Sequence, residues 1–257
     1  FTISMSSSSP GVTVGGPATV VIQDNDEPVP CKPKTDLIFV LDRSGSIREE
    51  DFNRMREFVN EIARELKVGE RNEDGEIIGQ AGIVTFSEEG EKRITLAQSQ
   101  DKNKFYDVVA RMPGPLLQGR TKTHRGLAIA DKELAVKSAG YREDDPDVKK
   151  MIMVITDGEQ TKESVSKGFV YVGDAMKPFF QRNMDVFAIG VGLDNEDAIN
   201  EVKDMVQVPE NAILAANYTD LLYRVESIIK KFCPAITICG TPQDDCSEFA
   251  TCADTGP

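Results

Sequence analysis

The feature that most constrains the fold of this chain is an alternation of short apolar runs with amphipathic segments between residues 34 and 232. The apolar runs are typical of buried strands, and apolar spacings of three and four between them are typical of helices. Strands are expected over residues 36–42, 76–87, 92–97, 149–156, 185–192 and 211–218. Helices are expected over residues 48–66, 101–112, 124–136, 172–183, 195–206 and 219–232. This order predicts an α/β fold with a six-stranded, mostly parallel sheet that helices cover on both faces.

The charge balance and the motifs that are missing narrow the classes of function. The formal net charge is −13 at pH 7, from 30 basic and 43 acidic residues. Binding to nucleic acid needs clustered Lys and Arg, so no nucleic-acid partner is expected. No apolar run approaches the roughly 18 residues of a membrane span, so this segment is not expected to insert into a membrane. The sequence has no P-loop and no glycine-rich dinucleotide motif, and its only histidine, His124, has no evident nucleophile. We therefore expect no enzymatic activity.

Polar residues stand where predicted strands end and where a predicted helix begins. Asp42, Ser44 and Ser46 follow the first strand at alternate positions, so their side chains point to one side of an extended turn. Asp157 ends a later strand, and Thr121 stands in a loop before a helix. Because ligands bind at the carboxyl ends of parallel strands, these oxygens are expected to converge. Hard oxygen ligands of this kind suit Mg²⁺ or Mn²⁺.

Simpler interpretations of the same residues remain open. Asp and Ser between a strand and a helix often only cap the helix, and Thr-Asp-Gly is a common turn sequence. Four basic residues stand beside the candidate ligands, namely Arg43, Arg120, Lys122 and Arg125. On an acidic protein they would give the rim of the site a local positive potential that steers an acidic ligand. The alternative is that they are ordinary solvated side chains.

The sequence DRSGS at residues 42–46, the first threonine of GRTKT and the aspartate of ITDGE resemble the metal-ion-dependent adhesion site of the von Willebrand factor type A (VWA) family. That family includes the inserted domains of integrins. The resemblance covers residues 31–233 and implies a doubly wound, Rossmann-like α/β fold with one antiparallel strand, expected at 92–97. The metal ligands that it implies are Asp42, Ser44, Ser46, Thr121 and Asp157. It also implies that the Mg²⁺ or Mn²⁺ ion accepts a carboxylate from a protein ligand.

The expected function is therefore that of an extracellular adhesion or matrix module whose partner, a matrix or cell-surface protein, presents an acidic side chain. Two alternatives remain, a regulatory VWA module of a secreted protease and a structural spacer whose metal site is unused. The tripeptide Asn-Tyr-Thr at Asn217 is a glycosylation sequon and is consistent with secretion.

The segments on either side resemble parts of other extracellular domains. Within residues 1–30, ATVVIQDNDEP resembles the closing strand of a Calx-β domain, in which acids such as Asp24 and Asp26 can bind Ca²⁺; a solvated acidic linker is the alternative. Residues 234–257 resemble the first half of an EGF-like domain. The sequence begins with Phe1 rather than Met, so a fragment or a processed product is expected.

The five cysteines have no Cys-x-x-Cys spacing, so their pattern favours disulfides and an oxidising compartment over a metal site. The EGF-like resemblance implies a Cys239–Cys252 disulfide and leaves Cys246 to pair beyond the end of the sequence. Cys31 and Cys233 are then expected to pair and to tie together the two ends of the VWA domain. In some members of the family the closing helix moves to change affinity. A bridge at Cys233 would resist that movement, so we expect a domain of fixed affinity.

Overall fold

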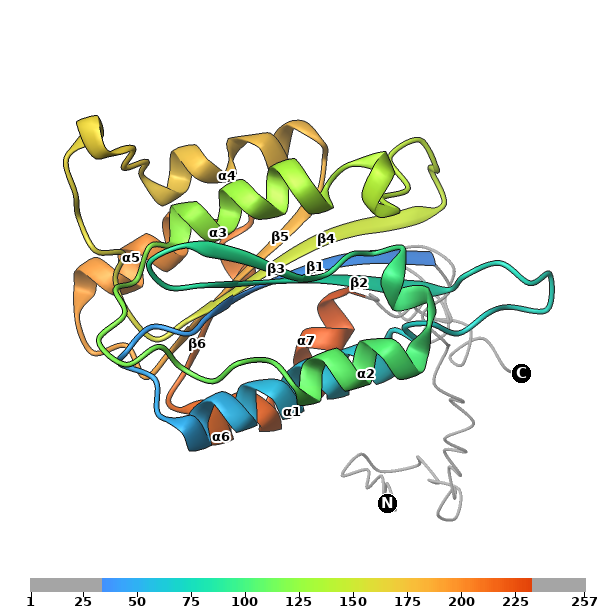
Figure 1. The fold of residues 1–257 in the computed structure, drawn as a ribbon, viewed down its shortest axis with the longest axis horizontal. Helices are drawn as coiled ribbons and strands as arrows, with labels where there is room; N and C mark the ends of the chain where they lie inside the picture. The colour runs from blue at the N-terminus through green and yellow to red at the C-terminus, as the bar shows by residue number, and fades with distance from the viewer. Residues whose placement is uncertain (1–33, 233–257) are drawn as a thin grey trace, which may run out of the picture. The chain divides into compact units, whose positions relative to one another are not determined.

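The computed structural model of the protein describes residues 34–232, which form one six-stranded sheet with helices on both faces (Figure 1). The order across the sheet is β3-β2-β1-β4-β5-β6. The strands are β1 (Lys34–Asp42), β2 (Gly79–Phe86), β3 (Gly90–Ile94), β4 (Val148–Thr156), β5 (Asp185–Val191) and β6 (Ala212–Ala215). All neighbouring strands are parallel except β2 and β3. This confirms the predicted fold class, with the antiparallel strand close to its expected place.

Within residues 34–232, seven α-helices pack on the sheet in two layers. They are α1 (Glu49–Glu65), α2 (Lys102–Ala110), α3 (Thr123–Ile129), α4 (Val172–Gln181), α5 (Glu196–Asp204), α6 (Tyr218–Tyr223) and α7 (Val225–Phe232). Figure 1 shows α1, α2, α6 and α7 on one face and α3, α4 and α5 on the other. Short 3₁₀ turns lie at η1 (Gln98–Gln100), η3 (Lys137–Ala139), η4 (Val165–Lys167) and η5 (Pro209–Asn211).

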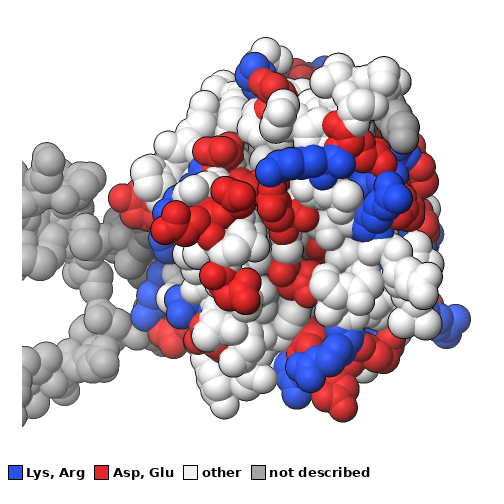
Figure 2. Space-filling model, turned by 90° about the vertical axis from the view of Figure 1, so that its left-hand side faces the viewer, with Lys and Arg blue, Asp and Glu red and all other residues white. Residues whose placement is uncertain are grey.

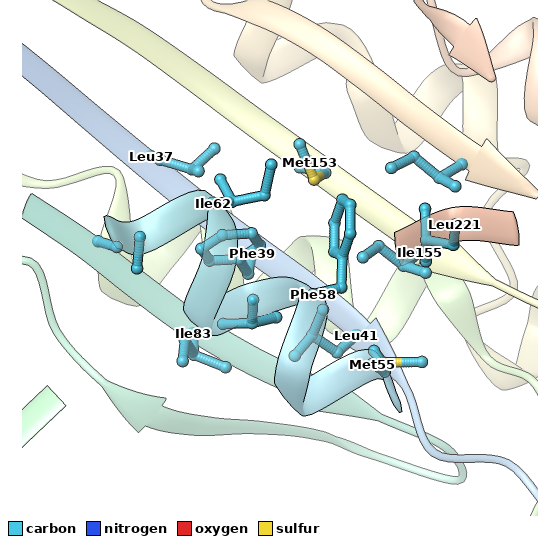
Figure 3. Packing of buried hydrophobic residues seen from close by; sticks show 14 of the residues in the cluster. Leu37, Phe39, Leu41, Met55, Phe58, Ile62, Ile83, Met153, Ile155 and Leu221 are labelled. Atoms are coloured by element: carbon cyan, nitrogen blue, oxygen red, sulfur yellow. The ribbon is translucent and has the colours of Figure 1, made fainter. Parts of the chain in front are cut away.

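The central strand β1 supplies residues to both hydrophobic cores because alternate side chains of a strand point to opposite faces. Leu37, Phe39 and Leu41 pack against the α1 layer, where Figure 3 shows Phe39 and Leu41 beside side chains of that helix. Ile38 and Val40 pack against the opposite layer. All five are completely buried. The strand is therefore held from both sides, which fixes the position of the polar residues that follow it.

Most elements begin or end within three residues of the expected boundaries, and two of the expected helices also change type or divide. The expected helix over 124–136 changes into a π-helical turn, η2 (Ala130–Leu134), after α3 ends. The expected helix over 219–232 is two helices, with Arg224 between α6 and α7. The expected strand over 211–218 ends early because the side chain of Asn217 accepts a hydrogen bond from the Asp220 amide and starts α6.

A buried ion pair lies at the amino end of strand β1. The carboxylate of Asp36 on β1 has no exposed surface and accepts hydrogen bonds from the Arg142 amide at 2.7 Å and from Arg142 Nε at 2.8 Å. The same guanidinium donates to the backbone carbonyls of Thr35 and Ile77. Arg142 therefore ties the loop before β4 to β1 and to the segment before β2.

Several predictions fall outside the described residues. They are the Calx-β-like segment 1–30 with Asp24 and Asp26, the EGF-like segment 234–257, and the cysteines Cys31, Cys233, Cys239, Cys246 and Cys252. The domain boundaries at residues 31 and 233 also stay predictions. None of the helices between residues 34 and 232 combines the length and the apolar character needed to span a bilayer.

Candidate metal centre

The first loop of the site runs from the end of β1 to the start of α1. The amide of Ser44 donates to Asp42 Oδ1 at 2.7 Å, and the hydroxyl oxygens of Ser44 and Ser46 lie 3.1 Å apart. The N-cap of α1 is Arg48, and no side chain caps this helix. The capping interpretation of these residues is therefore wrong, since none of the three side chains caps α1.

The loop after β4 joins the first loop through side chains. Ser46 Oγ donates to Asp157 Oδ1 at 2.7 Å, and Thr156 Oγ1 donates to Asp42 Oδ2 at 2.7 Å. The parallel pairing of β1 with β4 places the ends of these two strands next to each other. Asp42, Ser44, Ser46 and Asp157 thus form one hydrogen-bonded group at the carboxyl edge of the sheet.

The loop that carries Thr121 is attached to both of the others. The Gly45 amide donates to the Gly119 carbonyl at 2.9 Å, and the Thr161 amide donates to the Thr121 carbonyl at 2.7 Å. A Cβ atom at Gly45 would lie 2.8 Å from the Gln118 nitrogen, so this approach of two backbones requires glycine. Thr121 is 8% exposed and stands beside the loop that contains Asp157. The three predicted loops are therefore contiguous.

Burial makes the two carboxylates of the site costly to ionise. Asp42 has no exposed surface, and its burial, followed by the negative charge of Asp157, raises its pKa to about 7. Hydrogen bonds from Thr156 and Ser44 act in the opposite direction. Burial also raises the pKa of Asp157. A cation held between the two groups would offset both effects.

The donor set fits Mg²⁺ or Mn²⁺. It consists of carboxylate and hydroxyl oxygens, which are hard ligands, and each carboxylate oxygen keeps a further lone pair. Among the described residues no group of three or more His, Cys, Asp and Glu side chains could hold a metal ion. A metal in this region of the molecule would therefore depend on the serine and threonine hydroxyls, which add no charge.

The basic residues beside the site do not provide free positive charge. Lys122 is only 6% exposed and its Nζ lies 2.7 Å from Glu88 and 3.2 Å from Glu163, so this lysine is neither an unpaired charge at the rim nor an ordinary solvated side chain. Arg43, Arg120 and Arg125 are paired with glutamates as well. The carboxylates that accept these pairs belong to Glu88, Glu89, Glu91 and Glu163. Figure 2, which views the left-hand side of Figure 1, shows acidic and basic side chains interleaved on this face.

Two residues of the site carry no signal in the sequence. Thr156 belongs to an apolar strand pattern, yet its hydroxyl holds Asp42. Tyr218 is 5% exposed, and its hydroxyl has no hydrogen-bond partner among the described residues. Burial raises the pKa of Tyr218 well above its usual value, and the charges of Asp157, Asp42 and Asp51 add to the shift.

His124 has a structural environment. It is 4% exposed, its Nδ1 lies 2.9 Å from Gln160 Oε1, and its ring packs edge-on against Phe169. Burial lowers its pKa. The backbone N–H of Gln160 donates to Glu201 Oε1 at 2.9 Å. These contacts link α3 to α5 through Gln160, which follows Asp157 by three residues.

Comparison with protein families gives a match over most of the described chain. The model for the von Willebrand factor type A domain matches residues 36–227. Matrilin-1 of Mus musculus is 26% identical over 219 residues, which cover 84% of this chain and 40% of that protein. Integrin alpha-M of Mus musculus is 27% identical over 195 residues, or 68% of this chain and 16% of the integrin. The transmembrane cell adhesion receptor mua-3 of Caenorhabditis elegans is 24% identical over 216 residues, or 83% of this chain and 5% of the receptor.

Solved structures show the same fold. Proximal thread matrix protein 1 from the mussel byssus superimposes with a TM-score of 0.67 at 21% identity, over 79% of this chain and 49% of that one. A further structure of the mussel protein has zinc in its metal-ion-dependent adhesion site (MIDAS) motif. It superimposes with a TM-score of 0.65. The chain spans less than half the length of each of these four proteins.

Proposed function

The chain belongs to the von Willebrand factor type A domain family, and from this premise we propose that residues 31–233 are an extracellular adhesion or matrix module that binds a protein ligand through a divalent metal ion. The proposed metal ligands are Asp42, Ser44, Ser46, Thr121 and Asp157. The observation that carries the proposal is the hydrogen bond from Ser46 to Asp157, which joins two loops of the motif at 2.7 Å. The relative mua-3, which is named a transmembrane cell adhesion receptor, supports the class of function.

The chemistry of the donor set favours recognition of an acidic partner. The bound ion would supply an electrophilic centre that accepts a carboxylate from another protein. Two carboxylates leave a divalent ion neutral, whereas a third aspartate in place of a hydroxyl would make the site negative and repel that ligand. Ser46 is exposed while Asp42 is buried, so the side of the site that faces solvent is lined by a hydroxyl. These residues would thus hold the ion from the protein side and leave its solvent side open to a ligand.

No catalytic role is proposed for this domain. The alternatives, a regulatory module of a secreted protease and a spacer with an unused metal site, make different predictions. Metal-dependent attachment that tracks the five proposed ligands supports the adhesion proposal. Attachment that persists without metal would favour the spacer.

Contacts at the opposite end of the sheet support the proposed Cys31–Cys233 disulfide. Lys34, three residues after Cys31 in the sequence, is paired with Val148 on β4. The next residue, Lys149, donates from Nζ to the carbonyl of Phe232 at 2.7 Å, and Phe232 precedes Cys233. The chain segments that lead to the two cysteines therefore approach the same end of β4. We propose that the bridge fixes α7 and with it the affinity of the domain.

The predictions for the two flanking segments are also proposals. They are a Calx-β-like segment at 1–30, in which Asp24 and Asp26 either belong to a solvated acidic linker or bind Ca²⁺, and an EGF-like segment at 234–257 with a Cys239–Cys252 disulfide.

The proposal is tested by solid-phase binding of the protein to a panel of immobilised matrix proteins in Mg²⁺, Mn²⁺ or EDTA. We expect binding to at least one matrix protein in either metal, and loss of that binding in EDTA and in Asp157→Ala. Thermal melting in the same buffers reports metal binding separately. Gly158→Ala is a matched control, because a Cβ atom there meets nothing within 4 Å. Metal-dependent melting with metal-independent attachment would refute the adhesion mechanism while leaving the metal site intact.

A further inference from the structure

The sequon Asn217-Tyr218-Thr219 lies at the start of α6, on the surface of the domain. The side chains of Asn217 and Thr219 are exposed, whereas Tyr218 between them is buried. Asn217 Oδ1 accepts a hydrogen bond from the Asp220 amide at 2.9 Å and caps the helix. Its Nδ2 donates no hydrogen bond within residues 34–232, so the nitrogen that an N-linked sugar uses is free in the folded domain.

A groove begins at Asn217 and runs between α6 and the first turns of α1. It has a volume of about 550 Å³, and its walls include Arg48, Arg54 and Tyr223. Figure 1 shows α6 and the beginning of α1 at the same corner of the molecule. Tyr223 is 81% exposed, so its ring is open to contact with an occupant of this groove.

The chemistry of this groove suits a saccharide. The exposed ring of Tyr223 offers a flat apolar surface with a polar edge, on which the C–H face of a sugar can pack. Arg48 and Arg54 are both held by Asp51, at 2.8 Å and 3.0 Å, and their remaining N–H groups can donate to sugar hydroxyls. A neutral, hydroxyl-rich occupant uses both kinds of surface without disturbing these ion pairs.

We propose that Asn217 carries an N-linked glycan whose first sugars lie in the groove between α1 and α6. Asn217 Nδ2 bonds to C1 of the first sugar of a lipid-diphosphate-linked oligosaccharide. The bond from C1 to the diphosphate oxygen breaks, Nδ2 loses one proton, and the lipid diphosphate leaves.

The position of the glycan gives it a place on the ligand-binding face. Arg48, at one wall of the groove, follows Ser46 of the metal loop by two residues. The Ser46 hydroxyl in turn donates a hydrogen bond to Asp157. The first sugars would therefore form one edge of the surface around the metal. This consequence rests on the proposed function, whereas the modification and its groove do not.

The modification is tested by the intact mass of the protein secreted from eukaryotic cells. We expect an added oligosaccharide that peptide N-glycosidase removes, and that is absent from Thr219→Ala and Asn217→Asp. Both variants destroy the sequon but keep a side chain that caps α6, so they fold with the native helix start. Secreted protein with the unmodified mass would overturn the proposal.

The groove is tested by nitration of surface tyrosines with tetranitromethane, read by peptide mass spectrometry. Tyr171, which is 65% exposed and lies outside the groove, is an internal control. We expect nitration of Tyr223 to be severalfold slower in the glycosylated protein than in Thr219→Ala, with Tyr171 unchanged. Equal nitration of Tyr223 in the two forms would overturn the placement of the sugars. The metal-dependent melting of Thr219→Ala, measured alongside, tests the metal site independently of the glycan.

Discussion

Ser46 Oγ donates a hydrogen bond of 2.7 Å to Asp157 Oδ1 across 111 positions of sequence. This contact joins the loop after β1 to the loop after β4, at the one edge of the sheet where both strands end. The two side chains are held in the positions from which both could contact one ion. The predictions below follow from this arrangement and from the contacts that support it.

Gly45→Ala is expected to loosen the site. The added Cβ would lie 2.8 Å from the Gln118 nitrogen, so the first two loops must separate. We expect a loss of about 1–3 kcal/mol in the free energy of unfolding and weaker binding of Mg²⁺. Urea unfolding and titration calorimetry measure the two effects. Gly158→Ala, with no atom within 4 Å of its Cβ, is the control, and equal behaviour of the two variants would contradict the close approach.

Asp36→Ala is expected to destabilise the domain by about 3–5 kcal/mol, because it leaves the guanidinium of Arg142 without its buried partner. The exposed pair between Arg111 and Asp107, at 2.8 Å, provides the comparison. Asp107→Ala should cost less than about 1 kcal/mol, since exposed ion pairs contribute little. Chemical denaturation of both variants checks this, and a small effect of Asp36→Ala would show that the buried pair is not needed.

Glu201→Gln is expected to change how stability depends on pH. Burial, with a smaller contribution from the charge of Glu159, raises the pKa of Glu201 to about 7. The folded state therefore binds a proton that the unfolded state has lost above its usual pKa of 4.5, and stability decreases as pH rises from there through 7. The variant keeps the oxygen that accepts from Gln160 but does not titrate.

Melting of Glu201→Gln between pH 4.5 and 8 should consequently show a smaller decrease in midpoint than the wild type. Glu226→Gln is the control, because the contact with Lys230 lowers the pKa of Glu226. Loss of the Glu226 carboxylate should act in the opposite direction, because it removes stability that the wild type has above the usual pKa of a glutamate. Parallel pH profiles for Glu201→Gln and the wild type would argue against the raised pKa.

Cys31→Ser is expected to lower the melting midpoint and to free α7. On the chain-entropy model a bridge that closes so long a loop contributes up to about 5 kcal/mol. The double variant with Cys233→Ser should match the single one, because each removes the same bond. Non-reducing peptide mapping shows the bridge directly, and an unchanged midpoint in Cys31→Ser would refute its role.

The sequence predicted the parts of the site that depend on local order. Alternate positions after a buried strand were enough to place Asp42, Ser44 and Ser46 on one loop, and parallel pairing placed the end of β4 next to it. Contacts between distant side chains could not be foreseen in this way. Lysine is usually a surface residue. Only the positions of Glu88 and Glu163 in the folded domain place Lys122 in a buried ion pair.

The same limit applies to the helices and to the other end of the sheet. The apolar period of 219–232 continues through Arg224, so it gives no indication that α6 ends there. The pairing of Asp36 with Arg142 spans 106 positions and depends on where the loop before β4 crosses the sheet. Tyr218 has the pattern of a core residue, and that pattern does not indicate that its buried hydroxyl has no hydrogen-bond partner among the described residues.

The most direct test of the central claim is anomalous scattering from crystals of the protein grown with Mn²⁺. We predict a single manganese peak between the loops of Asp42 and Asp157, within coordination distance of Ser44 and Ser46 Oγ, and its loss in Asp157→Ala. A manganese peak elsewhere, or none at this edge of the sheet at millimolar Mn²⁺, would contradict the account.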